Sequence, residues 1–166
     1  MVAAEPEPTR RSLLKSDRRS LLLTAAARQF AERGFAVVRL EDIGAAADVS
    51  GPAIYRHFPN KEALLVELLV EISTRLLAGG RAVLDEAPDP DSALQQLVDF
   101  HLDFTLNEPE LIRIQDRDLT QLPPGALRQV RTSQRQYVEI WVRVLREINP
   151  GLAEPDARLM AHAAFG

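Results

Sequence analysis

The sequence predicts an all-α protein with about eight helices. Apolar residues recur at helical spacing in successive segments, and Gly, Pro, Asn or Asp separates each segment from the next. No stretch alternates apolar and polar residues for long enough to predict a strand, and the sequence contains no internal repeat or low-complexity block. With 166 residues, of which 46% are apolar, the chain can bury a substantial core.

Residues 1–15 combine Glu–Pro pairs with basic residues, which favours a flexible basic arm. Helices are expected after it over residues 17–33, 41–47, 51–58, 61–78, 92–106, 111–119, 126–148 and 154–166.

Residues with known capping or breaking tendencies set the ends of the first four helices. Gly34 is expected to stop the first helix. Ser50 is a suitable N-cap for the third helix, and Pro52 falls in its first turn, where a missing N–H costs nothing. Asn60 is expected to cap the fourth helix, and the Gly79–Gly80 pair is expected to end it.

Charge is unevenly distributed along a chain whose net charge is -4. Residues 9–61 hold ten Lys or Arg against five Asp or Glu, whereas residues 62–166 hold ten against seventeen. This asymmetry favours an N-terminal part that faces a polyanion, although chance clustering on solvated helix faces is the alternative.

Composition also narrows the cellular setting. The chain has no cysteine, which excludes disulfides and thiolate metal sites. We find no signal peptide and no apolar run long enough for a membrane span, so we expect a soluble, cytoplasmic protein without membrane partners.

The stretch EDIGAAADVSGPAIYRHFPNKEAL, residues 41–64, has the features of a helix-turn-helix. In that motif the second helix enters the major groove of DNA with its N-terminal residues facing base edges. Gly51 and Ala53 keep this edge thin, while Tyr55, Arg56 and His57 supply hydrogen-bond donors close by. Two helices packed in an ordinary bundle are the alternative.

The run LLLTAAARQFAERGFAVVRLEDIGAAADVSGPAIYRHFPNKEALLVELL resembles the DNA-binding domain of the tetracycline-repressor (TetR) family. The resemblance covers about residues 16–75 and implies a three-helix DNA-binding domain whose helix-turn-helix spans 39–58. Residues 76–166 would form a helical ligand-binding and dimerisation domain, which we expect to be incomplete at its C-terminus. The residues implied to contact DNA are Arg39, Ser50, Gly51, Pro52, Ala53, Tyr55, Arg56, His57 and Lys61.

The resemblance assigns different roles within this set. Residues 50–53 would face bases, Tyr55 and His57 would reach the backbone or base edges, and Lys61 would meet a phosphate at a helix N-terminus. For Arg56, solvation at the surface is the alternative. The expected core residues of the motif are Ile43, Ala47, Ile54 and Phe58.

One position departs from the family pattern. Arg39 stands where the family commonly has a Thr or Ser that caps the second helix, and loss of a cap typically costs about 1 kcal/mol. Arg39 is therefore either a phosphate or base contact or a solvated arginine. The basic residues Arg10, Arg11, Lys15, Arg18 and Arg19 either add DNA contacts or belong to a disordered tail.

The resemblance further implies a homodimer on a palindromic operator of double-stranded DNA, released by a small apolar or amphipathic effector. The expected effector contacts are Phe100, His101, Phe104, Arg113, Gln134, Tyr137, Trp141 and His162. The alternative for these residues is a role in the core or an interface. No clustered histidine spacing predicts a metal, and no cofactor is expected.

Other functions compete with a repressor. A hydrolase or lyase using His101, Arg113, Asp116 and Asp118 is disfavoured, because acids at i and i+2 face different sides of a helix, and the chain has neither a Gly-rich phosphate loop nor a nucleophile elbow. We therefore expect no enzyme. The remaining alternatives are a helical protein-interaction adaptor and a constitutive DNA-binding regulator without a ligand.

Overall fold

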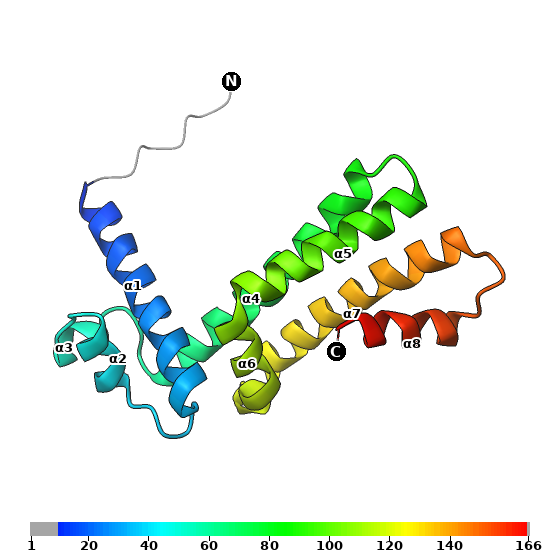
Figure 1. The fold of residues 1–166 in the computed structure, drawn as a ribbon. Helices are drawn as coiled ribbons and strands as arrows, with labels where there is room; N and C mark the ends of the chain where they lie inside the picture. The colour runs from blue at the N-terminus through cyan, green and yellow to red at the C-terminus, as the bar shows by residue number, and fades with distance from the viewer. Residues whose placement is uncertain (1–9, 166) are drawn as a thin grey trace. The chain divides into compact units, whose positions relative to one another are not determined.

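The computed structural model describes the backbone of residues 10–165 and the side chains of residues 14–165. In this part of the chain, turns and loops join helices and there is no strand, which confirms the predicted all-α class (Figure 1). The chain divides into two compact units, residues 1–65 and 66–166. No helix in the described part is long and apolar enough to cross a membrane.

Unit 1 consists of α1 (Arg10–Arg33), α2 (Leu40–Ala46), α3 (Gly51–Ile54) and the first five residues of α4 (Lys61–Glu86). Its apolar side chains meet in one core. The fully buried members include Leu22, Phe30, Val38, Ile43, Ile54, Phe58, Leu64 and Leu65. The expected core positions Ile43, Ile54 and Phe58 are confirmed, whereas Ala47 is half-buried at the edge.

Helix α1 begins earlier than the sequence indicated. It starts at Arg10 rather than at Asp17, so residues 10–15 form helical turns and not part of an arm. Residues 12–14 (Ser-Leu-Leu) and Lys15 contain no helix breaker, which allows the helix to extend. The remainder of the expected arm, residues 1–9, lies outside the described residues.

Helix α3 is shorter than predicted. It ends at Ile54, and Tyr55, Arg56 and His57 form a turn before Phe58. The amides of Arg56 and His57 donate to the carbonyls of Ala53 and Ile54, which lie three residues back. Pro59 disfavours helical geometry in the residue before it, so the α-helix cannot continue through Phe58.

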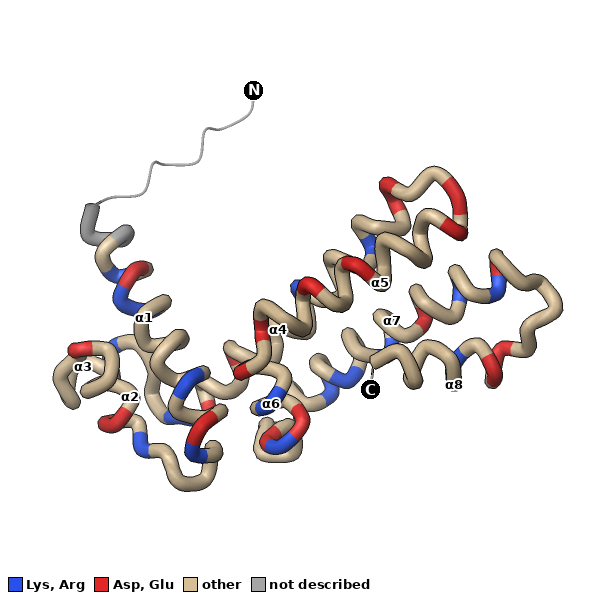
Figure 2. Tube along the Cα trace, viewed as in Figure 1, with Lys and Arg blue, Asp and Glu red and all other residues tan. Residues whose placement is uncertain are grey.

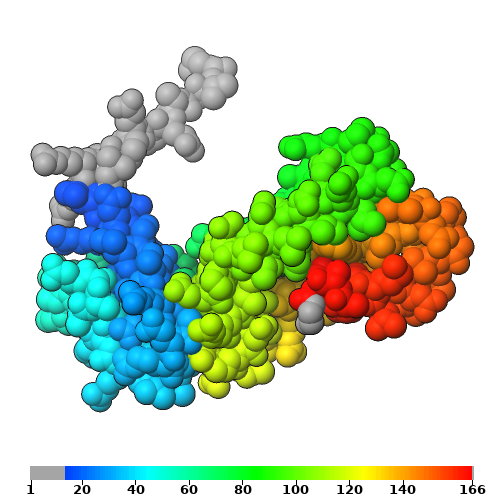
Figure 3. Space-filling view, in the orientation of Figure 1, coloured from blue at the N-terminus to red at the C-terminus, as the bar shows by residue number. Residues whose placement is uncertain are grey.

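Unit 2 holds the rest of α4, α5 (Pro90–Asn107), α6 (Pro109–Asp118), the 3-10 turn η1 (Leu119–Gln121), α7 (Pro124–Ile148) and α8 (Glu154–Phe165). Helix α7 lies against both α5 and α8, and α7 and α8 form a continuous surface (Figure 3). The core of this unit includes Leu77, Leu97, Tyr137, Trp141, Val144, Ala157 and Ala161.

The Gly79–Gly80 pair does not end α4, which continues to Glu86. A Cβ atom on Gly79 would lie 2.1 Å from the Phe100 ring, and one on Gly80 would lie 2.8 Å from the Tyr137 ring. The two glycines are therefore sites where aromatic rings of α5 and α7 approach the α4 backbone. The glycine pair was predicted to be a helix stop because glycine is common at helix ends. It is also common where another group approaches the backbone closely, which is its role here.

Candidate nucleic-acid interface and cavity

The turn between α2 and α3 depends on a close backbone approach. Asp48 adopts a positive φ of 54°, and the amide of Val49 donates to the carbonyl of Gly44 at 2.8 Å. A Cβ on Gly44 would lie only 2.9 Å from the Val49 oxygen. Glycine at position 44 thus allows α2 and α3 to be joined by a tight turn.

Helix α2 begins without a side-chain cap, as the sequence predicted. Arg39 occupies the N-cap position with extended backbone, and its exposed side chain makes no capping hydrogen bond. The Asp42 carboxylate instead accepts from the Arg39 amide at 3.2 Å and pairs with Arg33 at 3.2 Å. These contacts replace part of the missing cap and leave the Arg39 guanidinium at the surface.

The leading edge of α3 is thin. Ser50 and Pro52 are exposed, Gly51 and Ala53 are half-exposed, and Ser50 makes no capping bond with its hydroxyl. A Cβ on Gly51 would have no neighbour within 4 Å. The structure therefore brings residues 50–53 together as a narrow, accessible ridge of small side chains.

Tyr55 links the turn after α3 to α2. Its hydroxyl donates to a Glu41 carboxylate oxygen at 2.8 Å, while half of the side chain remains exposed. The bond raises the pKa of Tyr55, and a backbone hydrogen bond together with this one lowers the pKa of Glu41. Glu41 was not among the sequence-predicted site residues.

His57 lies near four cations that we call the α1 basic cluster. Three of them, Lys15, Arg18 and Arg19, are on α1, and Arg56 is in the turn after α3. Burial, followed by the charges of this cluster, lowers the pKa of His57. The ring nitrogen Nδ1 is buried without a hydrogen-bond partner in the described structure. The imidazole is therefore neutral at pH 7, and the cations around it supply the positive charge of the site.

Arg19 ties the basic cluster to the motif. Its guanidinium donates to the His57 carbonyl at 2.7 Å and lies 4.1 Å from the centre of the Phe58 ring. Lys15, Arg18 and Arg19 fall on one helical face because their spacing is i, i+3 and i+4. Figure 2 shows Lys and Arg positions in blue on α1. This spacing is present in the sequence, but it indicates a shared face only if Lys15 belongs to the helix, and residues 1–15 were predicted to be an arm.

Lys61 has a different environment from the one that the family resemblance implied. Its ammonium donates to the backbone carbonyls of Phe35, Ala36 and Val38 at 2.7, 3.2 and 3.1 Å. It also lies 4.4 Å from the centre of the Phe35 ring. An ammonium group has three donors, and all three are used to hold the loop between α1 and α2.

A cavity of about 360 Å³ lies within unit 2. Five of the eight sequence-predicted effector contacts line it: His101, Phe104, Gln134, Tyr137 and His162. The structure does not bring the other three to its lining. The Phe100 ring packs on Gly79, Trp141 is buried in the core, and Arg113 is exposed.

Packed rings form one side of this cavity, which we call the aromatic cavity. His101 Nδ1 lies 3.2 Å from the Tyr137 hydroxyl, and the two rings are stacked. Phe165 packs on the His101 ring and edge-on to Trp141. Burial lowers the pKa of His101 and raises that of Tyr137 to about 12, so both side chains are uncharged at pH 7.

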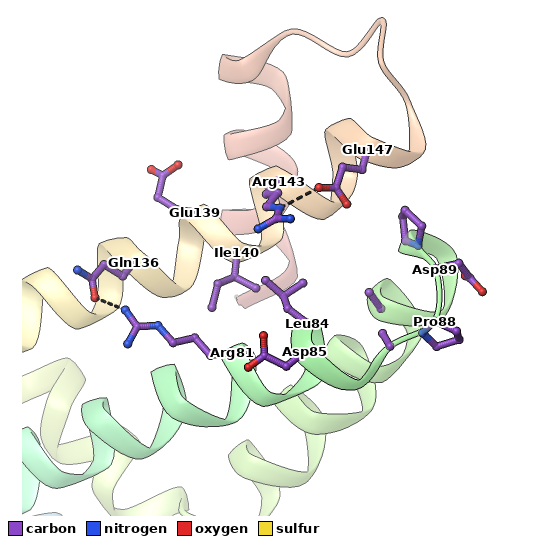
Figure 4. Close-up of a pocket in the computed structure, with 13 residues that line it drawn as sticks. Arg81, Leu84, Asp85, Pro88, Asp89, Gln136, Glu139, Ile140, Arg143 and Glu147 are labelled. Carbon is purple, nitrogen blue, oxygen red and sulfur yellow. Dashed lines mark hydrogen bonds and ion pairs between the residues drawn. The ribbon is translucent and has the colours of Figure 1, made fainter.

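A second hollow, of about 590 Å³, lies between the C-terminal part of α4, the α4–α5 turn and α7 (Figure 4). Its rim is charged, but Arg81 donates to Gln136 at 3.0 Å and Arg143 pairs with Glu147 at 2.8 Å. Acidic positions gather around this turn in Figure 2. Because the rim cations already have partners, this hollow is a weaker candidate for a ligand than the aromatic cavity.

The acids proposed for a rival enzyme do not form a paired site. Asp118 is buried and pairs with Arg117 at 2.9 Å, whereas Asp116 is exposed at the aromatic cavity. Among the described residues, no group of three His, Asp or Glu is placed to hold a metal ion.

A three-helix unit with a tight α2–α3 turn, a thin exposed edge on α3 and basic residues on α1 defines a helix-turn-helix DNA-binding protein. Residues 22–68 match the family of bacterial regulatory proteins called tetR, and residues 87–166 match the tetracyclin repressor-like C-terminal domain. The chain therefore belongs to the tetR family of transcriptional regulators.

Individual proteins agree with this assignment. The transcriptional repressor KstR2 of Mycobacterium tuberculosis is 30% identical over 145 residues, which cover 85% of this chain and 72% of KstR2. The regulator CymR of Pseudomonas putida is 31% identical over 141 residues, covering 82% and 68% of the two chains.

Solved structures show the same similarity. KstR2 of M. tuberculosis superimposes with a TM-score of 0.79 at 26% identity, over 89% of this chain and 77% of that one. A TetR-family regulator from Bordetella parapertussis gives a TM-score of 0.79 at 26% identity, over 87% and 74%. The predicted family and the predicted role in DNA-binding transcriptional regulation are confirmed.

Proposed function

We propose that this regulator is a homodimeric repressor that leaves a palindromic operator when a small molecule occupies the aromatic cavity of unit 2. The observation that carries the proposal is the cavity itself, because five of the predicted contact residues line it. Two of them, His101 and Tyr137, have stacked, uncharged rings. Its volume is within the range of small-molecule sites, which is about 300–1,000 Å³. The similarity to proteins named as repressors supports repression rather than activation.

For the DNA interface, we propose a division of labour based on exposure. Residues 50–53 face base edges, because they are small and accessible. Phosphates are contacted by four exposed basic residues, Lys15, Arg18, Arg39 and Arg56. Tyr55 and His57 shape the surface between them through the bond to Glu41 and the contact with Arg19. We leave Lys61 out of the phosphate contacts because its donors are already engaged.

For regulation, we propose that the effector prefers a conformation whose half-site spacing does not fit the operator. Helix α4 contributes Lys61–Leu65 to unit 1, and Ile72, Ser73 and Leu76 to the cavity lining in unit 2. A change at the cavity can thus reach unit 1 through one continuous helix. A coupling of about 1–3 kcal/mol would change operator affinity about 5- to 150-fold.

Selection from a random duplex library tests the DNA part. Repeated binding and amplification should enrich inverted half-sites whose centres are about 34 Å apart or a multiple of that distance. Enrichment of single, unpaired half-sites would contradict the dimer, and no enrichment at all would contradict sequence-specific binding.

The phosphate contacts are tested separately by salt dependence. Arg18→Ala and Arg56→Ala should each lower the slope of log K against log salt by about 0.9, as expected for one lost phosphate contact. Arg131→Ala, an exposed arginine on α7, serves as the matched control and should leave the slope unchanged.

A further inference from the structure

The chemistry of the aromatic cavity narrows the class of effector, an inference that rests on the proposed role of the cavity. None of its lining residues is Lys or Arg, and with histidine counted as neutral, Asp116 is the only lining residue with a formal charge. A buried carboxylate or phosphate would therefore meet no cation, and burying an unpaired ion costs several kcal/mol. Asp116 would repel an anion further.

Other polar groups in the lining are uncharged. The hydroxyls of Ser73 and Thr105 donate to carbonyls within their own helices, to Leu69 at 2.7 Å and His101 at 2.8 Å. They are not available as donors to a ligand in this arrangement. The half-buried amide of Gln134 supplies a neutral donor and acceptor.

His101 offers one more hydrogen-bonding atom. Its Nδ1 faces the Tyr137 hydroxyl, while Nε2 makes no hydrogen bond within the described residues. In the neutral ring, Nε2 is a donor when Tyr137 donates to Nδ1, and it is an acceptor when Nδ1–H donates to Tyr137. A carbonyl or hydroxyl oxygen of a ligand can accept from Nε2–H in the first tautomer, and a ligand hydroxyl can donate to Nε2 in the second.

We propose that the cavity takes an uncharged molecule with an apolar body and one carbonyl or hydroxyl group hydrogen-bonded to His101, and that it rejects carboxylates. The apolar body packs on Phe104, Tyr137 and Phe165. Cations rank between the two, because Asp116 is exposed and its attraction is screened by water.

Three probes of matched shape test this ranking by isothermal titration on the full chain: 1-acetyladamantane, 1-adamantanecarboxylate and 1-(aminomethyl)adamantane. The ketone should bind at least tenfold more tightly than the carboxylate, with the amine between them. The only tryptophan, Trp141, packs on Phe165 at the cavity, so its fluorescence reports where the probes bind.

The outcomes separate the two levels of the proposal. Carboxylate binding equal to or tighter than ketone binding, with a change in Trp141 fluorescence, would overturn the uncharged class and leave the effector cavity standing. Binding of none of the three probes would overturn both the class and the cavity.

His101→Leu tests the hydrogen bond. It should weaken the ketone about tenfold while changing the affinity for 1-ethyladamantane, which has no oxygen, by less than twofold. An equal loss for both probes would overturn the role of His101. If the variant does not fold, His101→Gln in the same pair of titrations replaces it, and here the ketone preference should be retained.

Discussion

Replacing Lys61 with methionine distinguishes a positioning role from a phosphate contact. Methionine keeps an apolar stem against Phe35 but removes the ammonium that holds three carbonyls of the α1–α2 loop. A hydrogen bond to a charged group contributes about 1.5–3 kcal/mol, and an exposed cation–π contact about 0.5–1 kcal/mol. Lys61 is only half-buried, so water screens these interactions and their sum must be reduced. We expect the free energy of unfolding to fall by about 2–3 kcal/mol in total.

The assay combines thermal unfolding with operator titrations at several salt concentrations. The variant should unfold about 5–10 °C lower. Operator affinity should fall at every salt concentration with an unchanged salt slope, since no phosphate contact is lost. Lys15→Met is the matched control: the chain has only two lysines, and Lys15 is an exposed member of the α1 basic cluster. This control should lower the slope by about 0.9 and leave the unfolding temperature within about 2 °C.

The opposite pattern would refute the reasoning. A Lys61→Met protein with unchanged stability and a salt slope lowered by about 0.9 would show that the lysine contacts a phosphate. Chemical reactivity gives an independent check, because acetylation at limiting reagent should modify Lys15 before the hydrogen-bonded Lys61.

Three further predictions concern stability and the motif. Gly80→Ala should destabilise unit 2 by about 1–3 kcal/mol, because its Cβ would lie 2.8 Å from the Tyr137 ring, whereas Gly125→Ala, with open space around its Cβ, should be neutral or slightly stabilising in thermal unfolding. Below about pH 6.5 the free energy of unfolding should fall, because the pKa values of His57 and His101 are lowered in the folded protein and the unfolded chain therefore binds more protons. Unfolding at pH 5.5 and pH 7.5 measures this fall, and His101→Gln should make it smaller. A double-mutant cycle of Tyr55→Phe and Glu41→Ala should give a small favourable coupling in the free energy of unfolding, and each change should separately weaken operator binding. Strictly additive effects on the free energy of unfolding would contradict a stabilising Tyr55–Glu41 hydrogen bond.

The sequence predicted the helix-turn-helix because short-range signals determine it. Asn60 accepts from the Ala63 amide at 2.9 Å, as expected of an N-cap, and Pro52 lies in the first turn of α3. The periodic apolar residues Ile43, Ile54 and Phe58 are buried as predicted. Caps, helix-starting prolines and apolar spacing are properties of neighbouring residues, so a linear reading detects them.

Contacts between distant segments could not be predicted in the same way. The role of Lys61 depends on a loop that lies 23–26 residues earlier in the chain. The course of α4 through Gly79 and Gly80 depends on rings contributed by Phe100 and Tyr137. In both cases the residue type permits several roles, and packing between elements selects one of them.

The cavity shows an intermediate case. Aromatic and polar residues on the later helices indicated a small-molecule site, and five of them line it. Tyr137 and Trp141 are both buried in the core, but Trp141 lies one turn further along α7 and is not among the residues that line the cavity. Residue type therefore identified the candidates, and their positions along the helices decided which of them line the cavity.

The central claim, that the leading edge of α3 reads DNA, is tested most directly by Gly51→Glu. The new side chain has open space in the free protein and adds a negative charge at the edge that we propose faces the bases. Gly125→Glu is the matched control, since it also places a glutamate in open space in the first turn of a helix, in unit 2. Both proteins should unfold at the wild-type temperature. In an operator shift assay, Gly51→Glu should lose at least a hundredfold in affinity while Gly125→Glu binds normally; equal binding by the two variants would contradict the account.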